Sequence, residues 1–106
     1  MTLTENLAAL VGEIEQLVMN RPPEPDEDAL ARIREICFTI AHSDRSSGDI
    51  REKTVAIESQ AEIYFSVRKH ERYAQGGGWG AEGFVRMNVL RPCYQLRMAL
   101  REGPTR

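Results

Sequence analysis

The sequence predicts an all-α fold, a small bundle of four helices. Apolar residues recur at intervals of three and four in four stretches, as on amphipathic helices. Proline and glycine gather between those stretches, and no alternation of period two is long enough for a strand. Helices are predicted at residues 3–20, 27–42, 49–75 and 84–102 of a single domain, 1–106. The composition, 42% hydrophobic and 28% charged, is that of a globular domain.

The first helix begins with a capping box formed by Thr2 and Glu5. Its main apolar stripe is widened on one side by Val11 and Val18, which suits a bundle helix better than a two-stranded coiled coil. Its only charged residues are acidic. The stripe consists of Leu3, Leu7, Leu10, Ile14 and Leu17. The proline-rich segment 21–25 that follows predicts a stiff connector.

Asp26 is placed to cap the second helix. More than half of the circumference of this helix is apolar, so it is expected to lie between two neighbours. The apolar residues are Ala29, Leu30, Ala31, Ile33, Ile36, Cys37, Phe38, Ile40 and Ala41.

The third helix, 49–75, is the longest predicted element, with Asp49 and Glu52 as its capping pair. At 1.5 Å per residue it would be roughly 40 Å long. A helix of that length extends beyond a 12 kDa core, which predicts that part of its apolar face contacts another chain. Its two apolar rows are Ile50, Ile57, Ala61, Tyr64 and Ala56, Ile63, Val67, Ala74.

The fourth helix, 84–102, is predicted to kink or restart at Pro92, which lacks a backbone donor. It has two apolar faces and therefore needs two partners, one of which is expected to be a second copy of the chain. The faces are Val85, Val89, Cys93, Leu96, Leu100 and Met87, Leu90, Tyr94, Met98.

The glycine-rich loop 76–83 lacks the Gly-Lys-Ser/Thr pattern of a phosphate-binding loop, and a helix rather than a strand precedes it. A flexible hinge is one interpretation. The other is a partner-binding loop in which Gly77 and Gly78 present Trp79 as an aromatic anchor.

A basic segment precedes that loop, with Arg68, Lys69, Arg72 and Tyr73 as candidate partner-binding residues. Together with the arginines of the last helix it predicts, as an alternative function, a nucleic-acid-binding regulator. The net charge of −2 is poor support for that alternative. The charge is uneven, however: residues 1–53 carry 11 acidic and 6 basic side chains (−5), and residues 54–106 carry 5 and 8 (+3). The arginines in question are Arg86, Arg91, Arg97 and Arg101.

No catalytic residues, cofactor or metal ligands are predicted. The serines lack a nucleophile-elbow pattern, and neither cysteine has an activating histidine. Glu58 with Glu62, and Glu35 with His42, are spaced for a shared ligand but fall on polar faces without a Glu-x-x-His motif. A small-ligand or metal-binding bundle is thus a third alternative.

Cys37 and Cys93 are too few for a disulfide framework and sit among apolar neighbours, which predicts free buried thiols. No signal-peptide pattern or membrane-spanning stretch is present. These features predict a cytoplasmic protein. The function predicted from the whole sequence is a non-enzymatic interaction protein, an adaptor, regulator or assembly component, that acts as a homodimer and contacts a second partner through Trp79.

Overall fold

The computed structural model describes residues 2–22, 24–66 and 82–102, which form four α-helices and no strand. The helices are α1 (Leu3–Met19), α2 (Glu27–Ala41), α3 (Gly48–Phe65) and α5 (Glu82–Glu102). The predicted all-α helical bundle is therefore confirmed.

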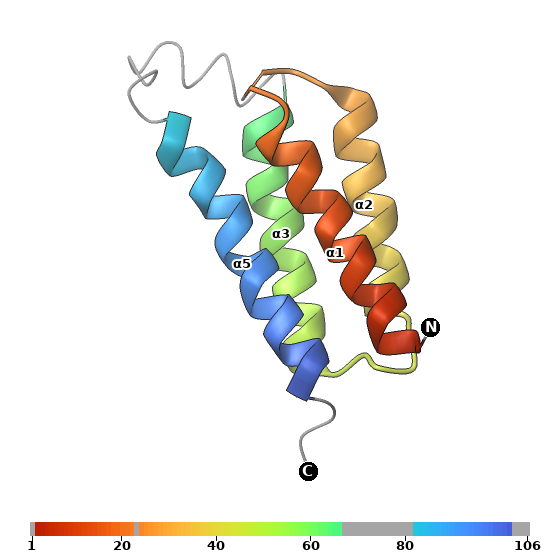
Figure 1. The fold of residues 1–106 in the computed structure, drawn as a ribbon. Coiled ribbons are helices and arrows are strands. Elements are labelled where there is room, and N and C mark those ends of the chain that lie inside the picture. The colour runs from red at the N-terminus through yellow and green to blue at the C-terminus, as the bar shows by residue number, and fades with distance from the viewer. Residues whose placement is uncertain (1, 23, 67–81, 103–106) are drawn as a thin grey trace.

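The helices run alternately up and down and form a closed ring (Figure 1). α1 and α3 run in one direction, and α2 and α5 run in the other. Each helix packs against the two beside it, in the order α1, α2, α3, α5 and back to α1, while the diagonal pairs have no Cα atoms within 8 Å of each other and meet only through side chains. Every packed pair is thus antiparallel, an arrangement typical of four-helix bundles.

The core fills the centre of this ring with residues from all four helices. The stripe of α1 is rotated relative to the sequence-based expectation: Val11 and Val18 are fully buried, whereas Leu3 is 42% exposed. On α3 the first predicted row, Ile50, Ile57, Ala61 and Tyr64, is buried as expected. The other buried hydrophobic residues are Leu7, Ile14, Ala29, Leu30, Ile33, Ile36, Cys37, Ile40, Phe65, Val85, Val89, Cys93, Leu96 and Leu100.

Side chains cap the first three helices. The Thr2–Glu5 capping box of α1 is present in both directions, and the Asp26 carboxylate accepts from the amide of Ala29 at 3.0 Å. The predicted cap of α3 is wrong by two residues, because the Ser47 hydroxyl accepts from the amide of Ile50. Asp49 lies inside the first turn instead, where its negative charge also favours the helix N-terminus.

α3 ends earlier than the predicted helix 49–75. Ser66 has extended backbone (φ −102°, ψ 133°), which interrupts the helix after Phe65. The carbonyl of Phe65 accepts a hydrogen bond from the backbone amide of Asp26 at 3.0 Å. Asp26, the N-cap residue of α2, therefore supplies a donor to one of the last carbonyls of α3. Residues 67–75 of the predicted helix lie outside the described residues.

The hydroxyl of Tyr64 joins three helices at the same end of the bundle. It lies 2.6 Å from the carbonyl oxygen of Arg21 and 3.1 Å from that of Val18, at the C-terminal end of α1. The side chain of Arg86, on α5, donates to the hydroxyl oxygen at 3.2 Å. The last carbonyls of α1 have no partner inside their own helix, so the Tyr64 hydroxyl supplies a donor at this end, where its contact with the Val18 carbonyl is buried.

α5 runs through Pro92 as one helix and begins at Glu82, inside the predicted loop 76–83. Pro92 is buried and leaves the carbonyl of Asn88 without its helical donor. A kink at Pro92 stays a prediction. Near the C-terminal end of α5, the guanidinium of Arg45 donates to the carbonyl of Leu100. This hydrogen bond links the α2–α3 connection to the last turn of α5.

Candidate interaction surface

The partner-binding residues predicted from the sequence all lie outside the described residues. They are Arg68, Lys69, Arg72, Tyr73, Gly77, Gly78 and Trp79. Contact with a partner through these residues stays a prediction.

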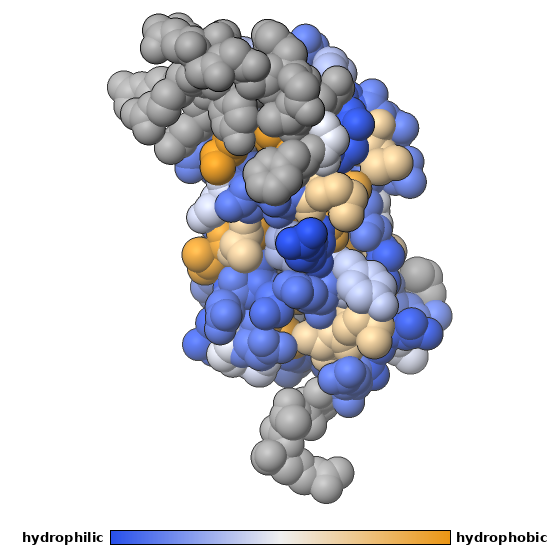
Figure 2. Space-filling model, turned by 90° about the vertical axis from the view of Figure 1, so that its left-hand side faces the viewer, coloured by the Kyte–Doolittle hydropathy of each residue, from blue (hydrophilic) through white to orange (hydrophobic). Residues whose placement is uncertain are grey.

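A groove between α1 and α5 is lined by exposed apolar side chains. Met19 on α1 and Met87 and Tyr94 on α5 are 55%, 49% and 60% exposed, and Leu90 lies half-buried between them. The groove has a volume of about 500 Å³. Seen from the α5 side, hydrophobic side chains interrupt the polar surface in several places (Figure 2). We call this surface, with Glu15, Gln16 and Arg91 at its edges, the α1–α5 groove.

The two predicted apolar faces of α5 explain how the groove arises. The first face, Val85, Val89, Cys93, Leu96 and Leu100, is buried in the core. The second face turns away from the core: Met87 and Tyr94 are exposed, and Leu90 and Met98 are half-buried. The sequence pattern predicts this face of α5 but not Met19, which belongs to no apolar stripe of the first helix and lies one turn beyond Gln16.

One ion pair joins the two walls of the groove. Arg97 of α5 donates to Glu15 of α1 at 2.5 Å and so ties the two walls together. Arg91 is exposed and makes no hydrogen bond or ion pair with any described residue. The groove therefore has one free positive charge beside its apolar lining.

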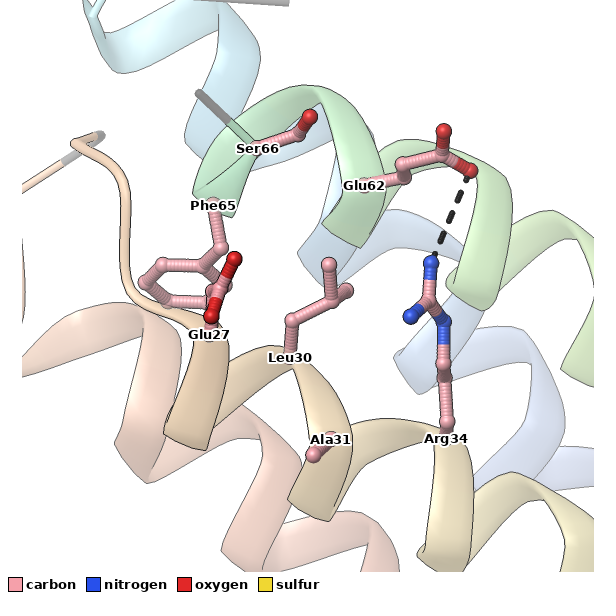
Figure 3. A pocket seen from close by; sticks show the side chains of 7 residues that line it. All are labelled: Glu27, Leu30, Ala31, Arg34, Glu62, Phe65 and Ser66. Atoms are coloured by element: carbon pink, nitrogen blue, oxygen red, sulfur yellow. Dashed lines mark ion pairs between the residues drawn. The ribbon is translucent and has the colours of Figure 1, made fainter. Parts of the chain in front are cut away.

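A second hollow, of about 490 Å³, lies between α2 and α3 (Figure 3). Its apolar floor, including Leu30 and Phe65, is already buried, and its walls carry Glu27, Glu62 and Arg34. Arg34 reaches from α2 toward Glu62 on α3, with 4.0 Å between nitrogen and oxygen. A hollow with little exposed apolar area and a charged rim offers a partner less than the α1–α5 groove does.

Phe38 is a further exposed apolar residue, on the outer face of α2. Its ring stacks on that of His42, with the ring centres 4.0 Å apart. His42 also contacts the carbonyl of Phe38 through Nδ1 at 2.9 Å. The pair covers the C-terminal end of α2, so the exposed Phe38 ring already has a contact within its own helix.

Two of the carboxylates that the sequence spaces for a shared metal ligand face arginines instead. Glu62 faces Arg34, and Glu35 pairs with Arg32. Within residues 2–22, 24–66 and 82–102, no group of three or more histidine, cysteine, aspartate or glutamate side chains is arranged to hold a metal ion.

Cys37 and Cys93 are both buried free thiols. Burial is the main cause that raises the pKa of each to about 12. They belong to the diagonal helices α2 and α5, which have no pair of Cα atoms within 8 Å of each other. Since a disulfide needs Cα atoms less than about 7 Å apart, these two residues cannot be bridged without movement of the backbone.

Two of the four arginines on α5 that the sequence assigned to a basic patch are used inside the bundle. Arg86 contacts Tyr64, and Arg97 contacts Glu15. This weakens the nucleic-acid alternative, because the field of a basic patch depends on free cations.

No helix in the described part of the chain is both long and apolar enough to cross a membrane. No protein-family model matches the chain, and comparison with curated proteins and with solved structures finds no match either. The described residues define the class of protein, an up-and-down four-helix bundle with a Met- and Tyr-lined groove between α1 and α5.

Proposed function

We propose that this protein is a non-enzymatic interaction protein that acts as a homo-oligomer through the α1–α5 groove. The observation that carries the proposal is the gathering of Met19, Met87 and Tyr94 on the surface of a bundle whose core is already filled. While these side chains are exposed to water, their apolar surface does not contribute to the stability of the fold. Burying each of them against a partner would contribute about 1–3 kcal/mol.

The composition of the groove supports the same proposal. Tyrosine, methionine and arginine are enriched at protein interfaces, and lysine and glutamate are depleted. Methionine side chains are flexible and adapt their shape to a partner, which makes a Met-lined groove a suitable contact surface. A protein with such a surface could act as an adaptor, regulator or assembly component without any catalytic group. The two free thiols favour a reducing compartment, and we propose a cytoplasmic location.

Sedimentation velocity at tens of micromolar protein tests this proposal. We expect a dimer that dissociates on dilution. Tyr94→Ser should shift the protein to the monomer, because it removes the aromatic side chain that lines the groove. Val55→Ser is the matched control: Val55 is also 60% exposed, but it lies on α3 and does not line the groove.

A wild-type protein that sediments as a monomer over this whole range would overturn the proposal. So would a Val55→Ser variant that dissociates as readily as the Tyr94→Ser variant, since the contact would then not lie at the groove. Circular dichroism of each variant establishes that it remains folded.

A further inference from the structure

The two walls of the α1–α5 groove carry opposite charge. α1 contains three glutamates and no basic residue, a formal charge of −3, whereas α5 contains four arginines and two glutamates, a formal charge of +2. At the groove itself, Gln16 and the Glu15 carboxylate, which accepts from Arg97 and has lone pairs left for a further donor, supply oxygen acceptors on the α1 wall, and Arg91 supplies donors on the α5 wall. Each copy thus presents an acidic or polar edge and a basic edge on either side of an apolar centre.

Arg91 limits what can occupy the groove. Its guanidinium has no partner among the described residues, and it stands beside Leu90 and Tyr94. An occupant that covered Leu90 and Tyr94 with apolar surface alone would remove part of the water around this charge at the edge of the groove without replacing its hydrogen bonds, which is unfavourable. The occupant therefore has to bring oxygen acceptors to the position of Arg91.

We infer that the occupant is a second copy of this chain, related by a two-fold axis, with α1 of each copy lying against α5 of the other. This inference rests on the proposed function and specifies its partner and geometry. In a two-fold interface, residue i of one copy meets residue j of the other, and j meets i. A surface with acceptors on one wall and donors on the other is complementary to itself in this arrangement, so Arg91 of each copy meets Glu15 and Gln16 of the other.

The size of the surface predicts the strength of the contact. α1 has 17 residues and is about 25 Å long, and two adjacent helices present a strip about 20 Å wide. Such a strip would bury roughly 500 Å² per copy, about 1,000 Å² in total, which is below the range of stable interfaces and within that of weak, transient ones. We therefore expect a dissociation constant in the micromolar range and a dependence on salt, because the paired charges lie at the rim.

Two charge variants test the arrangement by sedimentation equilibrium. Gln16→Arg places a cation opposite Arg91 of the second copy, and Arg91→Glu places an anion opposite its Glu15. Both positions are exposed, so the fold should be retained. We expect the dissociation constant of each variant alone to be at least about tenfold higher than that of the wild type. An equimolar mixture of the two should recover association, because Arg at position 16 then faces Glu at position 91 in the mixed dimer.

The double variant, Gln16→Arg with Arg91→Glu, should also recover self-association, since it exchanges the charges between the two walls. Ser59→Arg is the control: it adds the same charge at an exposed position of α3, away from the groove, and should leave association unchanged.

The outcomes separate this inference from the proposed function. Wild-type dimers that tolerate both single variants, or that the mixture and the double variant fail to restore, would overturn the two-fold pairing of α1 with α5 and leave a homo-oligomer of another geometry. A wild-type chain that is monomeric throughout would overturn both.

Discussion

One hydroxyl group, that of Tyr64, connects the C-terminal end of α1 with α3 and α5. The ring is fully buried and packs edge-on against Phe65, with the ring centres 4.7 Å apart. Because the hydroxyl faces two backbone carbonyls, and its contact with the Val18 carbonyl is buried, its removal takes a hydrogen bond from a backbone acceptor inside the bundle.

Tyr64→Phe should accordingly lower the free energy of unfolding by about 1–3 kcal/mol, the cost of buried backbone acceptors that lose a hydrogen bond. Tyr94→Phe removes the same atom from an exposed ring and should change it by less than about 0.5 kcal/mol. Urea denaturation of the two variants, below the concentration of self-association, gives the comparison. Equal effects would contradict the role assigned to the Tyr64 hydroxyl.

At this scale the sequence predicts which residue types are buried better than which individual residues are. The 3.6-residue period placed Leu3, Leu10 and Leu17 in the main stripe of α1, whereas the structure buries Val11 and Val18 and leaves Leu10 and Leu17 partly covered. Neighbouring residues differ by only about 100° around a helix, so a wide apolar stripe does not define its own centre. The positions of the neighbouring helices α2 and α5 decide which side of the stripe is buried.

At the scale of elements, α1 and α2 are joined by a two-pronged ion pair. Arg32 donates to both oxygens of Glu13, through Nε at 2.5 Å and through a terminal nitrogen at 2.9 Å. This hydrogen bonding holds the pKa of Glu13 below its usual range, and the charge of Arg32 adds to the effect. A carboxylate with a lowered pKa in the folded protein stabilises the fold above the pKa of the unfolded chain, and the contribution is lost as the pH falls through the folded value.

Glu13→Gln should therefore lower Tm at pH 7, and the difference from the wild type should shrink as the pH falls below the unfolded pKa of about 4 and through the lowered pKa of folded Glu13. Thermal melts between pH 7 and pH 3 measure this. Glu52→Gln is a suitable control, since Glu52 is exposed and has no ion pair in the described part of the chain. A Tm difference for Glu13→Gln that stays constant with pH would show that the pair contributes through packing alone.

The starts of the helices were predicted more accurately than the end of α3. Thr2 and Asp26 cap their helices as expected, because capping is a local interaction between residues three apart. The end of α3 depends on a hydrogen bond between Phe65 and Asp26, which are far apart in the sequence. Neither a proline nor a glycine marks that end, so no local pattern reveals it.

At the scale of the molecule, the described part of one copy forms a filled core of 20 buried hydrophobic residues without a second chain. The sequence suggested more apolar surface than one chain could cover. Among the described residues that excess is reduced to six large exposed side chains, three of which line the α1–α5 groove. Self-association therefore adds to a bundle with a filled core, and we expect the monomer to remain folded on dilution. The six are Leu3, Met19, Phe38, Val55, Met87 and Tyr94.

The two buried thiols give a probe of how this bundle opens. Cys37 and Cys93 lie on diagonal helices in the same core, and burial raises the pKa of both to about 12. The thiolate is the reactive form, so neither residue should react with a thiol reagent at pH 8 while the core is closed. Because no single helix can leave without exposing the core to water, we expect both thiols to react at one shared rate.

Time-resolved labelling with an aromatic disulfide reagent, followed by mass spectrometry, measures the two rates. In low urea concentrations both should rise together with the fraction of unfolded protein. Raising the protein concentration should slow both, because a dimer that forms only from folded monomers stabilises the folded state. Rapid reaction of Cys93 alone would mean that α5 detaches from the other three helices, and the bundle would then open in parts rather than as one unit.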